Sequence, residues 1–169
     1  RIASAAAGRF IGSTLELGGK SPNIVFEDAD IKNAAVGVVA GIFAAAGQTC
    51  IAGSRVFAEK AVYDELLQRV TERARSIRIG DPLEDSTELG PLAFEDQRDK
   101  VASYVDLGRT EGARVLTGGR PTDAGLGGYF YEPTVLVDVD NDMRIAREEI
   151  FGPVAAIMPF DSEEEVVRL

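Results

Sequence analysis

The sequence predicts an α/β protein built around a mainly parallel β-sheet. Its 169 residues are 45% hydrophobic and 27% charged, a composition typical of a globular domain that buries a core. Short apolar segments with the character of strands alternate along the chain with longer segments of helical period. Such alternation forms βαβ units, whose strands lie parallel in one sheet.

The first 26 residues show one helical pattern and two strand patterns. Residues 1–8 read as the body of a helix with no capping residue before it. Residues 13–17 alternate in polarity and end at Gly18-Gly19, which predicts a short strand that enters a tight turn. Residues 23–26, Asn-Ile-Val-Phe, predict a second strand.

A helix is predicted next. Asp28 or Asp30 caps its start, its end lies near Ala46, and Gly47 terminates it. One side of this helix is apolar through Ile31, Ala35, Val38, Val39, Ile42 and Phe43. A strand is expected after it at residues 55–58.

Two longer helices flank a polar loop in the middle of the chain. The first, at residues 61–79, is amphipathic through Val62, Leu66, Val70, Ala74 and Ile77. Gly80-Asp81-Pro82 stops it, and the loop extends to Pro91. The second helix, from about 94 to 111, turns Val101 and Val105 inward and ends at Gly112.

The remaining residues predict strands at 114–117, 134–139 and 154–160, with a Gly/Pro-rich turn or hairpin at 118–133. Asp161 or Ser162 caps a last helix whose first turn is acidic. Both ends of the chain fall within helical patterns, so we expect a piece of a longer protein.

Composition excludes several classes of function. With 18 Lys+Arg against 28 Asp+Glu, the net charge of −10 repels both nucleic acid and anionic membrane surfaces. No apolar run reaches the roughly 18 residues of a transmembrane helix. The absence of histidine excludes Ser-His-Asp and Cys-His catalysis and most zinc and iron sites, so no metal is expected. One cysteine cannot form an internal disulfide, which favours the cytoplasm.

The single cysteine lies in Gly47-Gln48-Thr49-Cys50, just past a predicted helix end, among small residues that let a ligand approach the backbone. A lone cysteine is most often a small buried hydrophobe, and the negative end of the preceding helix disfavours a thiolate. If Cys50 is a nucleophile, its partner base must be a carboxylate, because the chain has no histidine.

The candidate for this base is Glu16, and a second segment offers a carboxylate for a cofactor instead. Glu16 lies between two leucines at a predicted strand end, where ligands of open α/β sheets bind; a partly buried glutamate there acts as a base near neutral pH. The alternative is an edge-strand glutamate in water. In Arg147–Pro153, a carboxylate can accept two ribose hydroxyls and Phe151 can lie against a planar ring. The alternative there is a strand-entry turn with a core phenylalanine.

Taken in order, three segments resemble the signature motifs of the aldehyde dehydrogenase superfamily: Leu15-Glu-Leu-Gly-Gly-Lys-Ser-Pro-Asn23, Gly47-Gln-Thr-Cys50 and Glu148-Glu-Ile-Phe-Gly-Pro153. The resemblance implies a three-layer α/β sandwich, truncated at both ends. It implies that residues 1–16 are the trailing edge of a dinucleotide-binding domain. Residues 17–169 would be the catalytic thiol domain, incomplete at its C-terminus.

The resemblance also implies a reaction, the oxidation of an aldehyde to a carboxylic acid with NAD or NADP. Cys50 would attack the aldehyde and carry a thiohemiacetal and then a thioester, and Glu16 would activate the water that hydrolyses it. Glu149, Phe151, Leu17 and Gly18 would bind the cofactor. Intact members are homodimers or homotetramers.

Two other functions stay open. The chain can be a non-catalytic structural or binding relic of the family, or part of a CoA-acylating aldehyde dehydrogenase. By itself, the 169-residue chain is expected to be inactive, because the dinucleotide-binding domain lies outside it. Ala44-Ala45-Ala46 replaces a more polar stretch often found before the cysteine motif, which puts the shape of the substrate tunnel in doubt.

Overall fold

The computed structural model describes all 169 residues. Its main sheet has five strands in the order β1 (Pro22–Val25), β2 (Arg55–Glu59), β7 (Val154–Phe160), β6 (Thr134–Val137) and β3 (Arg114–Thr117). All neighbours are parallel except β3, which runs antiparallel to β6. The mainly parallel sheet expected from the sequence is therefore confirmed.

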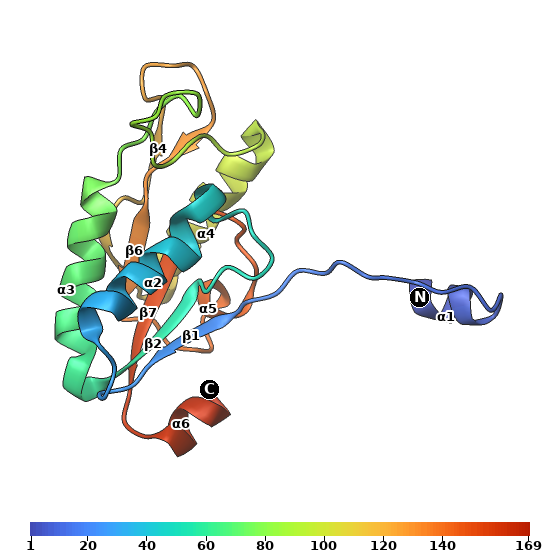
Figure 1. Cartoon of the computed structure of the whole chain (residues 1–169), viewed down its shortest axis with the longest axis horizontal. Helices are drawn as coiled ribbons and strands as arrows, with labels where there is room; N and C mark the ends of the chain where they lie inside the picture. Colours follow the sequence, from blue (N-terminus) through green and yellow to red (C-terminus); the bar gives the residue numbers. More distant parts are fainter.

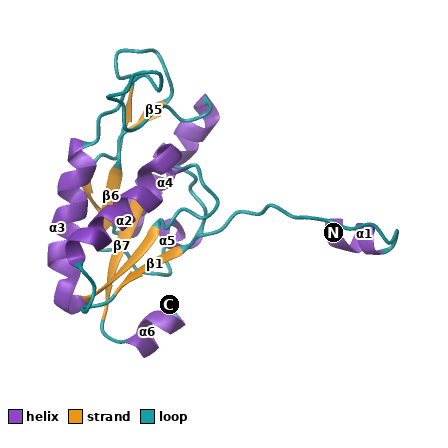
Figure 2. Ribbon diagram, in the orientation of Figure 1, coloured by secondary structure: helices purple, strands orange, loops and turns teal.

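Helices cover both faces of this sheet (Figure 1, Figure 2). On one face, α2 (Ile31–Phe43) packs against α3 (Lys60–Ser76). On the other, α4 (Glu95–Glu111) packs against the short α5 (Arg144–Arg147). The result is the three-layer sandwich implied by the resemblance.

The two covered faces explain the apolar strands in the middle of the sheet. Every residue of β6 is buried, and so is every residue of β7 except Pro159. A strand that is buried on both faces is a continuous apolar run rather than an alternating one. These strands form the centre of a core of 32 buried hydrophobic residues that also takes in the inner faces of α2, α3 and α4.

Local signals set most element ends where the sequence predicts them. The Asp30 carboxylate accepts a hydrogen bond from the Asn33 N–H at 3.1 Å, so Asp30 and not Asp28 caps α2. Ser162 caps α6 (Glu163–Arg168) in the same way. Gly112 ends α4 with a φ of 110°, a value that favours glycine. The expected hairpin contains β4 (Pro121–Thr122) and β5 (Phe130–Tyr131).

Several secondary-structure expectations are wrong. Residues 13–17 form no strand, because they lie alongside no partner strand and an isolated strand is unstable. The α2 helix ends at Phe43, since Ala45 and Ala46 have positive φ values of 49° and 54° and belong to a 3₁₀ turn, Ala44–Gly47. The amphipathic helix ends at Ser76, and Ile77 is already extended.

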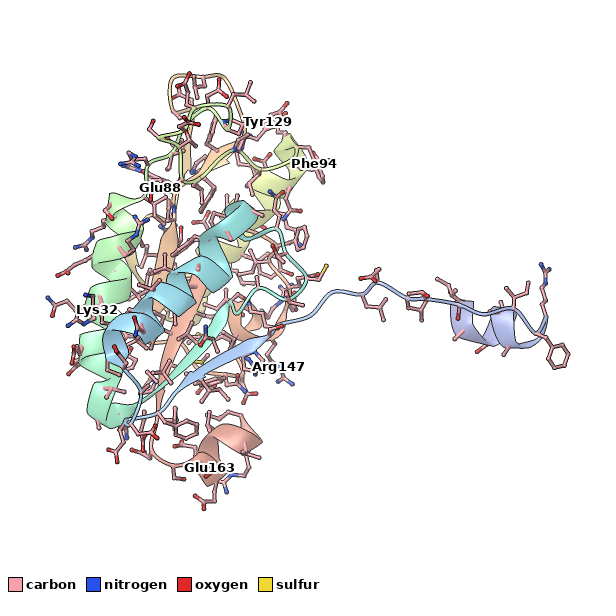
Figure 3. All side chains as sticks on the ribbon, viewed as in Figure 1. Lys32, Glu88, Phe94, Tyr129, Arg147 and Glu163 are labelled. Atoms are coloured by element: carbon pink, nitrogen blue, oxygen red, sulfur yellow. The ribbon has the colours of Figure 1, made fainter.

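The N-terminal residues form an arm that leaves the body of the molecule (Figure 1). It consists of α1 (Ile2–Ala7) followed by an exposed, irregular stretch, and Figure 3 shows that this arm extends clear of the sandwich. No helix anywhere in the chain is long and apolar enough to cross a membrane. The division at residue 16 into two domains stays a prediction.

Candidate active site

Cys50 lies in the turn that joins the 3₁₀ segment to β2, and its side chain is exposed. Cys50 is therefore accessible, and the alternative of a small buried hydrophobe is wrong. The Cys50 N–H donates to no acceptor in the chain. A free N–H beside an exposed thiol is a suitable donor for an oxyanion that forms on a substrate carbonyl.

Gly47 and Gln48 fix this turn from two sides. Gly47 has a φ of 71°, and a Cβ at this position would overlap the backbone carbonyl of Gly152. The Gln48 Oε1 atom accepts a hydrogen bond from the Ala93 N–H at 3.0 Å, which ties the turn to the loop before α4. Only glycine at 47 lets the cysteine turn lie directly against residues 149–152.

The carboxylate of Glu149 lies against the backbone of Gly18 and Gly19. Its Oε1 accepts a hydrogen bond from the Gly19 N–H at 3.3 Å, and a Cβ at Gly18 would overlap Oε2. Gly19 also faces the backbone carbonyl of Cys50. The glycine pair therefore lies between the cysteine turn and the glutamate loop.

One small pocket collects residues from all three motifs. Its lining comprises Gly19, Gly47, Thr49, Ala52, Ser54, Glu149, Ile150, Phe151 and Gly152. Gly19 and Glu149, which are 130 residues apart in the chain, thus meet at one place. Phe151 and Glu149 are both half-buried there, so neither is a core residue.

A model of the aldehyde dehydrogenase family matches residues 1–169. The chain belongs to the aldehyde dehydrogenase family. Betaine aldehyde dehydrogenase from Rhizobium johnstonii is 48% identical over 168 residues, and the match covers 99% of this chain and 34% of that protein. The enzyme of the same name from Brucella anthropi is 50% identical, with coverage of 99% and 35%.

Solved structures of aldehyde dehydrogenases are similar to the whole of this chain. An NAD+ complex of aldehyde dehydrogenase from Bacillus cereus is similar with a TM-score of 0.93 at 44% identity, covering 99% of this chain and 34% of that one. Betaine aldehyde dehydrogenase from Staphylococcus aureus in complex with NAD+ gives 0.92 at 38% identity, with the same coverage. The chain therefore spans about a third of the length of these relatives. The family and the fold class expected from the sequence are confirmed.

Within this aldehyde dehydrogenase segment, Glu16 and Leu17 lie on the arm and are exposed. The expectation of a partly buried Glu16 is wrong, because residues 13–17 pair with no strand and nothing in the chain covers them. Glu16 precedes Gly19 by three residues, so at most about 10 Å of extended backbone separates it from the pocket. Its role as a base stays a prediction.

Glu148, the neighbour of Glu149, has its carboxylate fully engaged. It accepts two hydrogen bonds from Arg144, at 2.8 and 3.0 Å, and one from the Tyr104 hydroxyl. The Arg144 and Tyr104 hydrogen bonds lower the pKa of Glu148 to about 2. Of the two adjacent glutamates, Glu149 is thus the one with acceptor capacity left for a ligand.

Lys20 lies next to this glycine pair, and its Nζ atom is covered and has no hydrogen-bond partner. Burial, together with the nearby charges of Arg55 and Lys100, lowers the pKa of Lys20 to about 8, although the carboxylate of Glu149 acts in the opposite direction. A lysine beside a glycine pair gives no sequence signal of burial. The burial of Lys20 arises from the fold, which brings Glu149 close to it.

Glu148→Gln is expected to reduce the stability of the chain at neutral pH but not in strong acid. Because the folded-state pKa of Glu148 lies below its ordinary value of 4.5, its stabilising effect is present above that value. The effect is lost as the pH falls toward about 2.

Urea unfolding from pH 7 to pH 2.5 measures this dependence. The gap in free energy of unfolding between wild type and Glu148→Gln should stay constant down to about pH 5 and then close. Glu84→Gln is the matched control, since Glu84 is exposed and forms no ion pair. A gap that is independent of pH would contradict the assignment.

Proposed function

We propose that this chain carries the nucleophile of an NAD- or NADP-dependent aldehyde dehydrogenase, which oxidises a small aldehyde to a carboxylic acid. The observation that supports it is the meeting of Gly19, the Cys50 turn and Glu149 around one pocket. The names of the relatives and the NAD+ complexes among similar structures point the same way. Betaine aldehyde is the first substrate to test, because several relatives are named for it.

Two features of the glycine pair and Glu149 support the binding of the nicotinamide end of a dinucleotide. Gly18 and Gly19 present backbone without side chains, and the Glu149 carboxylate occupies the space that a Cβ at Gly18 would take. That carboxylate accepts a single, long N–H bond, so it can take ribose hydroxyls in addition. Leu17 and Gly18 would border the cofactor, and Phe151 would contact the nicotinamide side.

The chain's residues divide the reaction into two steps. The Cys50 thiolate attacks the aldehyde carbon, and the Cys50 N–H donates to the developing oxyanion. Glu149 and Phe151 would hold the nicotinamide end of NAD(P)+, which would take up the hydride of the thiohemiacetal and leave a thioester on Cys50. Glu16 then removes a proton from the water that attacks this thioester, releasing the carboxylic acid and the free thiol.

Glu149→Gln is expected to slow hydride transfer and to leave cofactor-independent ester hydrolysis nearly unchanged. The substitution removes the charge from bonds to ribose hydroxyls, each worth about 1.5–3 kcal/mol at most. Stopped-flow measurement of NADH formation reports hydride transfer. Hydrolysis of an activated ester without cofactor reports attack by Cys50, so the two assays separate these steps. The experiment uses the full-length protein, meaning this chain with the flanking segments that its relatives have. Equal losses in both assays would indicate damage to the 148–153 turn instead.

Two competing functions have distinct products. A CoA-acylating enzyme would transfer the acyl group from Cys50 to the thiol of coenzyme A, whereas the proposed enzyme transfers it to water. Product analysis with and without coenzyme A separates them. A structural relic would yield no NADH with any aldehyde. The retention of Cys50, Glu16 and Glu149 together favours an enzyme, because a relic needs none of them.

By itself, the 169-residue chain is expected to bind NAD+ weakly or not at all and to self-associate. It supplies only the nicotinamide end of the site, and large apolar side chains of its arm are exposed: Ile2, Phe10, Ile11, Leu15 and Leu17. Calorimetry with NAD+ and NADP+, alongside light scattering, measures both properties. A monodisperse monomer with micromolar affinity would contradict the proposal. We further propose that the full-length protein is a cytoplasmic homodimer or homotetramer.

A further inference from the structure

Gln97 is one of very few buried polar residues in the chain, at 9% exposure. It lies in the first turn of α4, and its Nε2 atom donates two hydrogen bonds. One goes to the carbonyl of Ile150 at 2.9 Å and the other to the carbonyl of Phe151 at 2.8 Å. A single amide group from a distant helix thus binds two consecutive backbone carbonyls next to Glu149.

These two carbonyls have no other partner. No backbone N–H of the chain donates to the oxygen of Ile150 or of Phe151. Ile150 is buried, and a buried carbonyl without a hydrogen bond is costly. The conformation of the loop at this point therefore depends on Gln97.

The loop also has a conformation that needs support. Phe151 has a φ of 59°, in the left-handed region that bulky residues avoid. A backbone of this kind persists only where the surroundings hold it in place. Val101, one helical turn after Gln97, packs so closely under Gly152 that a Cβ there would overlap it. Gln97 and Val101 together form the surface of α4 on which the loop lies.

We infer that Gln97 is a positioning residue, which holds the Ile150 and Phe151 carbonyls so that the Glu149 carboxylate lies against the glycine pair and Phe151 lines the same pocket. The inference rests on the proposed function, since it assigns these two side chains to the cofactor. It differs from a purely structural role in one respect. Loss of the amide should weaken cofactor binding more than it affects the Cys50 turn, because a hydrogen bond between Gln48 and Ala93 also holds that turn.

The test compares Gln97→Met with Gln68→Met in the full-length protein. Both changes replace a glutamine amide by a thioether of similar size, but Gln68 is exposed on α3 and bonds only to Glu72. NAD+ affinity is measured by calorimetry, and hydrolysis of an activated ester is measured without cofactor. For Gln97→Met we expect the NAD+ dissociation constant to rise about tenfold while ester hydrolysis stays within about twofold. Gln68→Met should change neither.

A second variant covers the case in which Gln97→Met does not fold. Gln97→Glu keeps the shape of the side chain, and only its protonated acid can donate one hydrogen bond. Its dissociation constant relative to wild type should therefore fall as the pH is lowered from 8 to 6.

The outcomes are distinguishable. If wild type binds NAD+ and Gln97→Met binds it equally well, the inference is overturned and the proposed function stands. Equal losses in binding and in ester hydrolysis overturn it as well, in favour of a structural role. If wild type binds neither NAD+ nor NADP+, the proposed function fails and the inference fails with it.

Discussion

Replacement of Cys50 by alanine in the full-length protein is expected to abolish both aldehyde oxidation and ester hydrolysis, a loss on the order of 10⁴-fold or more. Both reactions begin with attack by the same thiolate, so they should disappear together. The Cys50 side chain is exposed and contributes nothing to the core, so the unfolding midpoint should not change. Steady-state rates in the two assays, with thermal unfolding of each variant, measure these effects.

Ser103→Ala is the matched control, because it removes one side-chain atom from an exposed residue of α4 without removing a nucleophile. It should retain most of both activities. Substantial turnover in Cys50→Ala would remove Cys50 from the mechanism. A drop in its unfolding midpoint would mean that lost activity reports lost structure.

Glu16→Gln is expected to slow the steady-state rate by about 10²–10⁴-fold while a rapid burst of NADH survives. The amide cannot accept a proton from water, so the thioester on Cys50 accumulates after hydride transfer. Rapid-mixing kinetics at enzyme concentrations high enough to resolve one turnover show the burst. Its amplitude should approach one NADH for each active site.

Glu84→Gln, an exposed glutamate far along the chain in the loop after α3, is the control for the loss of one charge. It should leave both phases unchanged. If the burst and the steady state of Glu16→Gln fell equally, Glu16 would act before hydride transfer. The assignment of Glu16 to thioester hydrolysis would then be wrong.

The sequence predicted the elements whose patterns depend on burial. The strand at 154–160 was placed at its observed bounds, because a strand covered on both faces needs a continuous apolar run. Gly112 alone likewise indicates where α4 ends. Residues 13–17 were misassigned, since alternation alone does not supply the partner strand that stabilises a short β segment. The four-residue α5 was missed because it is too short to show a helical period.

For the site, the sequence located the motifs but not their mutual arrangement. Gly18, Gly47 and Gly152 have no room for a side chain. For Gly18 and Gly47 the obstructing atoms lie more than a hundred residues away in the sequence, so no local pattern contains that information. Gln97 did leave a signal. It precedes Val101 and Val105 at four-residue spacing, so it is a polar side chain on the apolar face of its helix. A polar residue in such a place needs a buried partner, and the partner here is the loop that carries Glu149 and Phe151.

The most direct test of the central claim is to identify the residue that carries the acyl group. The Glu16→Gln variant of the full-length protein is mixed with NAD+ and betaine aldehyde or propanal, quenched in acid after the NADH burst, digested and analysed by mass spectrometry. We expect the mass of one acyl group on the peptide that contains Cys50, in proportion to the NADH formed and absent without NAD+. NADH formation with no acyl adduct on this peptide, or an adduct on another residue, would contradict the assignment of Cys50 as the nucleophile.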